Sequence, residues 1–213
     1  MPDSLQSRNR DKRDRKSTEE SIIAAFETVL LRDGVAGLGV NAIAQEAGIN
    51  KVLIYRYFVD LPGLARRWCE ASDFWPSELE LIGNDPDAFA ALPIVDGVRT
   101  VMRNYVDAIR ARPRTIELLA AELMAPTDVT RALADGLART GIGIGAYTHI
   151  NTNAPQLIEQ VWKLTYLVNA ITAYMAVRRG GNSMYLGYDL KTDEAWDYLR
   201  AIVDEMTVRF LND

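Results

Sequence analysis

The stretch VNAIAQEAGINKVLIYRYF, residues 40–58, constrains the fold more than any other segment of this chain. Gly48 tolerates the left-handed backbone that a sharp turn needs, and Asn50 is a favourable N-cap for the helix that follows it. The apolar residues before the turn recur at helical spacing: Val40, Ile43, Ala44 and Ala47. The segment therefore predicts two short helices, over 40–47 and 51–57, joined as a helix-turn-helix whose second helix is shaped for the DNA major groove.

Periodic apolar residues predict helices on both sides of this motif as well. A first helix over 18–33 would begin at the capping box Ser17–Glu20 and stop at Gly34. A fourth helix would begin at the cap Asp60, and the rest of the chain carries helical spacing up to residue 211. No segment reads convincingly as a strand. We therefore expect an all-α protein of about nine helices, in which an amino-terminal three-helix head precedes a larger helical domain.

Composition and charge set the organisation along the chain. Apolar residues make up 48% of the 213 residues and charged residues 25%, which is enough for a substantial core. Residues 1–16 hold 6 basic and 3 acidic groups with almost no apolar content, so we expect a disordered basic arm there. The head then covers 17–61 and the second domain 62–213. A basic amino-terminal end on an acidic body, with a net charge of −5 overall, suits a protein that turns one end toward phosphates.

The cysteine content and the apolar segments also indicate the cellular compartment. Cys69 is the single cysteine of the sequence, so no intrachain disulfide can form, which is consistent with a reducing cytosol. No early apolar segment resembles a secretory signal, and no apolar run is long enough to span a membrane. We expect a cytoplasmic protein with no membrane association.

The segment Ile22–Leu64 resembles the DNA-binding head of the TetR family of transcriptional regulators. The motif is carried by Ile43-Ala44-Gln45-Glu46-Ala47-Gly48-Ile49-Asn50 and by Ile54-Tyr55-Arg56-Tyr57-Phe58, after Gly34 and before Leu64. The resemblance implies an all-α homodimer in the shape of an Ω. It also implies a ligand pocket among central helices of the second domain and dimerisation through the last two long helices.

Several side chains are candidates for contact with double-stranded DNA. Lys51, at the start of the second motif helix, can reach a phosphate or base, Val52 a thymine methyl, and Arg56 guanine or phosphate. Tyr55 and Tyr57 resemble family residues whose hydroxyls hold the DNA backbone. The set is completed by Asn41, Gln45 and Asn50. Alternatively, the two tyrosines are core residues and the two cations merely solvated.

Four positions depart from the family pattern. Gly39 stands where a Ser or Thr often caps the first motif helix, so that cap should be weaker. Val52 and Leu53 replace a small or polar pair, and Leu61 replaces a common phosphate-binding Lys. The last change removes one electrostatic contact in each subunit, which lowers the expected salt dependence of DNA binding.

The second domain shows no catalytic or metal-ligand pattern, so we expect no enzyme activity, no metal and no cofactor. Its aromatic and Met side chains on helical faces can line an apolar pocket with a few polar anchors, although each can also be ordinary core. The candidates are Met102, Tyr105, Met124, Tyr147, Trp162, Tyr166 and Asn169. With the resemblance, they indicate a small apolar or aromatic effector.

Two long helices at the carboxyl end carry apolar residues at alternating spacings of three and four. Pairing with a second copy as a four-helix bundle is one interpretation, and an ordinary intrachain core is the other. The candidate interface residues are Leu157, Val161, Leu164, Val168, Ile171, Met175, Trp196, Leu199, Val203, Met206 and Phe210. An adjacent face with Ile158, Trp162, Tyr166 and Asn169 competes for this role.

Taken together, the sequence predicts a dimeric regulator, most simply a repressor that an apolar or aromatic effector releases from a palindromic operator. Two alternatives remain. One is a helix-turn-helix regulator controlled by a protein partner, with no small-molecule pocket. The other is an all-α enzyme or carrier, against which the lack of a catalytic constellation counts.

Overall fold

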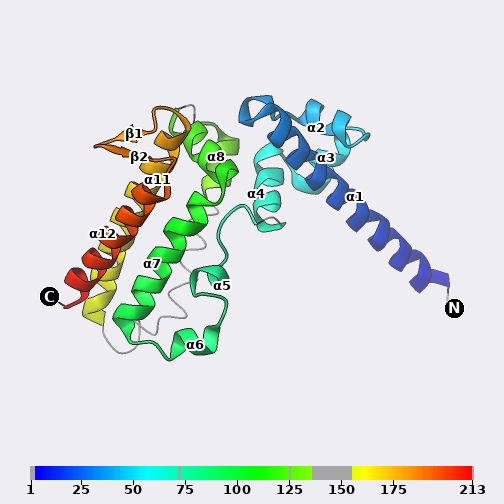
Figure 1. Cartoon of the computed structure of the whole chain (residues 1–213). Coiled ribbons are helices and arrows are strands. Elements are labelled where there is room, and N and C mark those ends of the chain that lie inside the picture. Colours follow the sequence, from blue (N-terminus) through cyan, green and yellow to red (C-terminus); the bar gives the residue numbers. More distant parts are fainter. Residues whose placement is uncertain (1–2, 72, 125, 136–154, 213) are drawn as a thin grey trace. The chain divides into compact units, whose positions relative to one another are not determined.

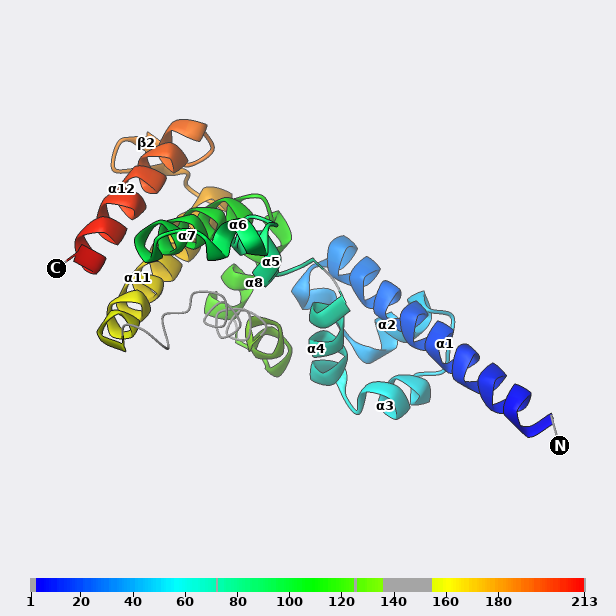
Figure 2. The ribbon, with the colours of Figure 1, turned by 90° about the horizontal axis from the view of Figure 1, so that it is seen from below.

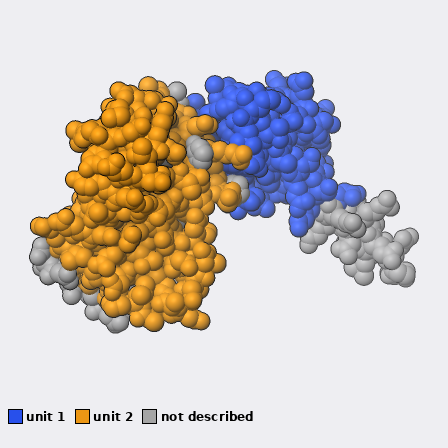
Figure 3. Space-filling view, in the orientation of Figure 1, with its two compact units in different colours: residues 1–72, 125–133 blue, residues 73–124, 134–213 orange. Residues whose placement is uncertain are grey.

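The computed structural model describes residues 3–71, 73–124, 126–135 and 155–212. This part of the chain is helical apart from one short hairpin (Figure 1). It divides into two compact units, coloured separately in Figure 3: unit 1 is 1–72 with 125–133, and unit 2 is 73–124 with 134–213. None of the described helices is both long and apolar enough to cross a membrane.

Unit 1 is built on the long helix α1 (Asp3–Asp33), which packs against α2 and α4 (Figure 2). Its other elements are η1 (Val35–Gly37), α2 (Val40–Glu46), α3 (Val52–Phe58) and α4 (Leu61–Ala71). Their apolar faces meet in a core in which the following side chains are buried: Ile22, Phe26, Ile43, Ile54, Leu64 and Trp68. The helices at 40–47 and 51–57 are thus found close to their predicted bounds. The whole of α4 belongs to unit 1, whereas the sequence suggested a boundary between residues 61 and 62.

The start of α1 differs from the expectation. The helix begins at Asp3, so residues 3–16 are helical and not a disordered arm, and Ser17 lies inside the helix, not at a cap. Residues 3–33 contain neither Pro nor Gly, so nothing interrupts the helix. The Thr18 hydroxyl donates to the Asp14 carbonyl at 2.8 Å, and Lys16 pairs with Glu20 at 3.8 Å, so the backbone continues through the predicted cap.

Unit 2 is arranged around α7 (Ile94–Arg110), which packs against four other helices. These are α5 (Glu78–Leu81), α8 (Pro113–Met124), α11 (Pro155–Gly180) and α12 (Asp193–Asn212). The segment between Pro76 and Pro93 contains both α5 and α6 (Pro86–Ala90). Residues 128–135 are also helical. The all-α prediction is confirmed, and within the described residues α5 and α6 are the two helices found beyond the nine expected.

One feature that the sequence did not indicate is a hairpin between α11 and α12. Strand β1 (Met184–Tyr185) pairs antiparallel with β2 (Tyr188–Asp189). Leu186 and Gly187 form the turn with φ of 49° and 91°, the two positive values that a tight hairpin turn requires. Two-residue strands leave too short an alternation to be recognised from sequence.

Candidate DNA-binding surface

Helix α3 is fixed from its inner side. Ile54 is fully buried and Phe58 nearly so, and they lie one helical turn apart on the face that packs into unit 1. Asn50 accepts a hydrogen bond from the Val52 backbone N–H at 2.9 Å, so its predicted role as a cap is confirmed. At the other end Asp60 caps α4 by accepting from the Gly63 N–H at 2.6 Å. These contacts set which side of α3 faces outward.

The outward side of α3 combines charge, an apolar group and a hydroxyl. Val52 is 63% exposed and Tyr55 50% exposed, and Lys51 and Arg56 are exposed beside them. Within the described residues neither cation takes part in an ion pair, so both charges are available to an outside anion. Val59, 77% exposed just past the helix end with φ of 70°, adds an apolar group that sequence reasoning missed.

The first motif helix contributes two polar side chains to the same region. The Lys51 ammonium lies 3.5 Å from the Asn41 side-chain oxygen, which brings the start of α2 beside the start of α3. Gln45 is exposed one turn further along α2, on the face that Asn41 occupies. As the sequence indicated, Gly39 precedes α2 without a side-chain cap. The carboxyl end of α2 is held to α1 by an ion pair between Glu46 and Arg32 at 2.6 Å.

Tyr57 lies differently from Tyr55. It is half-buried, its ring is 6.3 Å from that of Phe58, and the Arg15 guanidinium stands 5.5 Å from its centroid. Arg15 belongs to the segment expected to be disordered, so sequence reasoning did not include it in the site. The contact joins the amino-terminal part of α1 to the carboxyl end of α3.

Ion pairs of Arg32 lie where the carboxyl end of α1 meets α2. The hydrogen bonds that Arg32 donates to Asp33 and Glu46 raise the pKa of Arg32, and the same guanidinium lowers the pKa of Asp33. The ion pair between Arg32 and Glu46 joins the end of α1 to α2. The candidate surface therefore presents the two cations Lys51 and Arg56, which take part in no ion pair among the described residues, beside a paired Arg32.

The residues expected at a dimer interface divide between the chain's own core and its partly exposed surface. Six of them are core side chains, at most 7% exposed: Leu164, Val168, Met175, Trp196, Leu199 and Val203. The other five are half-buried: Leu157, Val161, Ile171, Met206 and Phe210. The face open to a partner is the competing one, where Trp162 is 56%, Tyr166 77% and Tyr174 47% exposed.

The residues expected to line a pocket differ in how far the described part of the chain buries them. Met102 and Tyr105 are buried on α7, whereas Met124, Trp162 and Tyr166 are exposed. Asn169 is half-buried and donates to the Thr165 carbonyl of its own helix at 2.8 Å. Tyr147 lies outside the described residues.

Among these candidates, Tyr105 has a polar group in an unusual environment. Its hydroxyl is buried without a hydrogen-bond partner among the described residues, and burial raises the pKa of the phenol. Buried hydroxyls are normally paired, so this one can accept or donate to a bound molecule. No group of three or more potential metal ligands occurs in the described part of the chain.

Residues 22–61 match the sequence model of the family described as "Bacterial regulatory proteins, tetR family". This range covers α2 and α3 completely. Among curated proteins none matches the chain at a significant level. The sequence match therefore lies in the part of unit 1 that carries the candidate surface.

Two solved structures are similar over nearly the whole chain. One, from Mesorhizobium loti MAFF303099, is described as a TetR-family transcriptional regulator and shares 16% identity, with a TM-score of 0.59 over 93% of this chain and 96% of that one. The other is a transcriptional regulator from Rhodococcus sp. Rha1, also 16% identical, with a TM-score of 0.53 over 91% and 96%. At this identity the likeness concerns the fold.

Proposed function

Because the chain belongs to the TetR family of DNA-binding transcriptional regulators, a family that is not enzymatic, we propose that it acts as a repressor on a near-palindromic operator. Two copies would each place α3 in the major groove, one helical turn or a multiple apart. A DNA ligand implies action in the cytoplasm. A dimer bound to the operator would block transcription from the neighbouring promoter until an effector releases the protein from the DNA.

The observation that carries this proposal is the exposed face of α3. Lys51 and Arg56 are free of ion pairs among the described residues and flank Val52 and Tyr55, so the face offers two donors, a methyl-sized contact and a hydroxyl. This is the combination that reads base edges and holds phosphates. Asn41 and Gln45 extend the surface along α2, and Asn50 supports it from the cap. Tyr57 contributes by positioning, because its ring is half-covered.

The dimer is proposed to form through the open face of α11. Trp162, Tyr166 and Tyr174 are spaced by four and eight residues on one side of that helix and are all exposed. Aromatic side chains left open on a long helix are typical of a surface that a partner covers. A second copy is the partner that a palindromic operator requires.

The effector is proposed to bind in unit 2 as a small apolar or aromatic molecule with at least one hydrogen-bonding group. Support comes from Tyr105, whose hydroxyl is buried and unpaired within the described residues beside the buried Met102. To act as an inducer, the molecule must bind more tightly to the arrangement of heads that does not fit the operator.

The DNA-binding proposal is tested by selecting duplexes from a random pool with the full chain and measuring affinity by gel shift. Lys51→Ala and Arg56→Ala should each weaken binding to the selected duplex by about 1–3 kcal/mol. Arg131→Ala is the matched control, since Arg131 is an exposed arginine of unit 1 away from α3. If both α3 variants fold and bind like the parent while the control behaves identically, the proposal is wrong.

A further inference from the structure

The junction between α3 and α4 contains an unusual backbone conformation. Val59 has φ of 70° and ψ of −52°, and the Asp60 N–H donates to the Phe58 carbonyl across it at 2.8 Å. These values define the γ-turn with positive φ, which is rare and strained in proteins. Among the described residues, Asn84 and Leu186 are the other non-glycine residues with positive φ, and neither is β-branched. A β-branched side chain in this region is a genuine outlier.

The fold requires this backbone conformation but does not require a valine. The Val59 N–H donates to the Tyr55 carbonyl at 3.0 Å, so the hydrogen bonding of α3 continues up to the turn. A Cβ on Gly63 would lie 2.1 Å from the Phe58 carbonyl oxygen, so the first turn of α4 approaches the turn closely from the other side. A glycine in place of Val59 would adopt the same backbone without strain.

The Val59 side chain contributes little to the packing of unit 1. It is 77% exposed, so it buries little apolar surface in the core. The valine therefore carries a conformational cost without a matching gain from packing among the described residues. Strained residues of this kind concentrate at functional sites, and the observed outlier is the reason to look for a function.

Val59 lies next to the candidate DNA-binding surface. It follows Tyr55 by four residues and Val52 by seven, and all three side chains are at least 50% exposed. Along the chain, Val52 and Val59 thus place an apolar group at each end of α3, about 10 Å apart at roughly 1.5 Å per residue, with Tyr55 and Arg56 between them. A duplex that covers Tyr55 and Arg56 would therefore come within reach of Val59 as well.

We propose that Val59 is an apolar DNA contact, whose methyl groups pack against a thymine methyl or a deoxyribose of the duplex bound by α3. The inference rests on the proposed function in taking DNA as the ligand of α3. Both targets present carbon atoms that a valine can cover, and the contact removes the valine methyl groups from water. The positive φ sets the direction of the side chain, so the strained turn presents an apolar group just beyond the last turn of α3.

The test separates the backbone conformation from the side chain. Val59→Gly and Val59→Asn both suit a positive φ but remove the methyl groups, so each variant should melt no lower than the parent. Each should bind the selected duplex about tenfold more weakly, since one methyl group kept from water is worth about fourfold. The matched control is Leu186→Gly, which relieves a φ of 49° at a side chain that is 83% exposed in unit 2, and its affinity should equal that of the parent.

A second arm of the experiment identifies the target on the DNA. Each thymine of the selected duplex is replaced in turn by uracil, which lacks the methyl group. If one replacement weakens the parent about fourfold and leaves Val59→Gly unchanged, Val59 contacts that thymine methyl. If no replacement does so while Val59→Gly still binds weakly, the contact is with deoxyribose.

Lys51→Ala distinguishes failure of this inference from failure of the proposed function. If Lys51→Ala weakens binding while either Val59 variant binds like the parent, α3 binds DNA and Val59 is not a contact. A lower melting temperature of Val59→Gly would show that the valine stabilises the turn, which also overturns the inference. If no duplex is selected at all, both the inference and the proposed function are wrong.

Discussion

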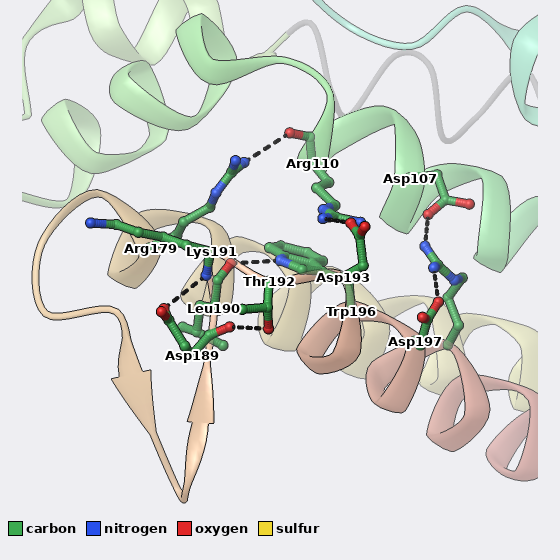
Figure 4. A network of polar contacts seen from close by, with 11 residues as sticks. Asp107, Arg110, Arg179, Asp189, Leu190, Lys191, Thr192, Asp193, Trp196 and Asp197 are labelled. Carbon is green, nitrogen blue, oxygen red and sulfur yellow. Dashed lines mark hydrogen bonds and ion pairs between the residues drawn. The ribbon is translucent and has the colours of Figure 1, made fainter.

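The guanidinium of Arg110, at the end of α7, lies 5.4 Å from the centre of the Trp196 ring and pairs with Asp193 at the start of α12 (Figure 4). Trp196 is fully buried, and its indole N–H donates to the Leu190 carbonyl at 2.8 Å. Arg179 of α11 donates to the Arg110 carbonyl at 3.3 Å. Arg110 thus joins the ends of three helices: its side chain connects α7 to α12, and its carbonyl accepts from Arg179 of α11.

Replacing this arginine should destabilise unit 2. Arg110→Gln removes a cation–π contact with a buried ring and an ion pair, and its side chain is only 20% exposed, so we expect a loss of about 1–2 kcal/mol in the free energy of unfolding. Denaturant titration followed by tryptophan fluorescence measures it. Arg209→Gln breaks a pair that is 73% exposed on the arginine side and should cost close to nothing. Equal losses in the two variants would contradict the role given to Trp196.

The same contact gives a pH dependence. Hydrogen bonding to Arg110 lowers the pKa of Asp193 below its unfolded value, so the folded protein binds this proton less readily. The stabilisation is present above the unfolded pKa, about 4, and is lost as the pH falls through the folded value. The stability difference between the parent and Asp193→Asn should therefore shrink on acidification, as urea unfolding at a series of pH values would show. A difference that grows below pH 4 contradicts this assignment.

The helix-turn-helix was predictable because its information is local. Asn50 caps the helix that it precedes, and Ile54 and Phe58 are one turn apart, so cap, length and buried face follow from a few neighbouring residues. The outward placement of Lys51 and Arg56 follows from the same geometry. These features need no knowledge of what lies further along the chain.

The buried face of α11 was not predictable in this way. Leu164 and Val168 lie on one apolar stripe and Trp162 and Tyr166 on another, and periodicity shows that both exist without showing which one the rest of the chain covers. Only the packing of α7, α8 and α12 decides this. The extension of α1 before residue 18 was not predicted for a different reason. A charged helix buries little apolar surface, so its sequence carries almost no hydrophobic periodicity.

Substitutions at two glycines near α3 should change the stability of the fold in opposite directions. A Cβ on Gly63 would lie 2.1 Å from the Phe58 carbonyl oxygen, so Gly63→Ala must displace the turn between α3 and α4. Gly39 has extended backbone and nothing within 4 Å, so Gly39→Ser can add the missing cap to α2. We expect Gly63→Ala to lower the melting temperature, and Gly39→Ser to add about 0.5–1 kcal/mol of stability.

Gly63→Ala should also weaken binding to the selected duplex, although it removes no side chain that contacts DNA, because it shifts the carboxyl end of α3. Calorimetry and gel shift on the same preparations separate the two effects. If Gly63→Ala melts like the parent, the close approach to Phe58 is not maintained in solution.

The unpaired hydroxyl of Tyr105 gives a prediction that does not depend on knowing the effector. A buried polar group without a partner costs free energy, so Tyr105→Phe should leave the ligand-free protein as stable as the parent or make it more stable. Tyr198→Phe, at an exposed tyrosine stacked on Tyr188, is the control and should change little. A marked loss of stability in Tyr105→Phe would show that the hydroxyl is paired after all.

The open face of α11 predicts how dimerisation can be broken without unfolding the chain. Trp162→Glu and Tyr166→Glu place a charge on side chains that are 56% and 77% exposed, so each subunit should fold normally. In a dimer the same charges would be buried without a partner, which is costly, so sedimentation should show a monomer. Operator binding should fall as well, because one head holds only half of a palindrome.

Leu123→Glu provides the comparison, since Leu123 of α8 is 68% exposed and lies off α11. It should leave the sedimentation coefficient unchanged. If all three variants remain dimers, the two copies meet elsewhere, and the aromatic face of α11 must be covered by something other than its own copy. If Leu123→Glu alone yields a monomer, α8 and not α11 carries the interface.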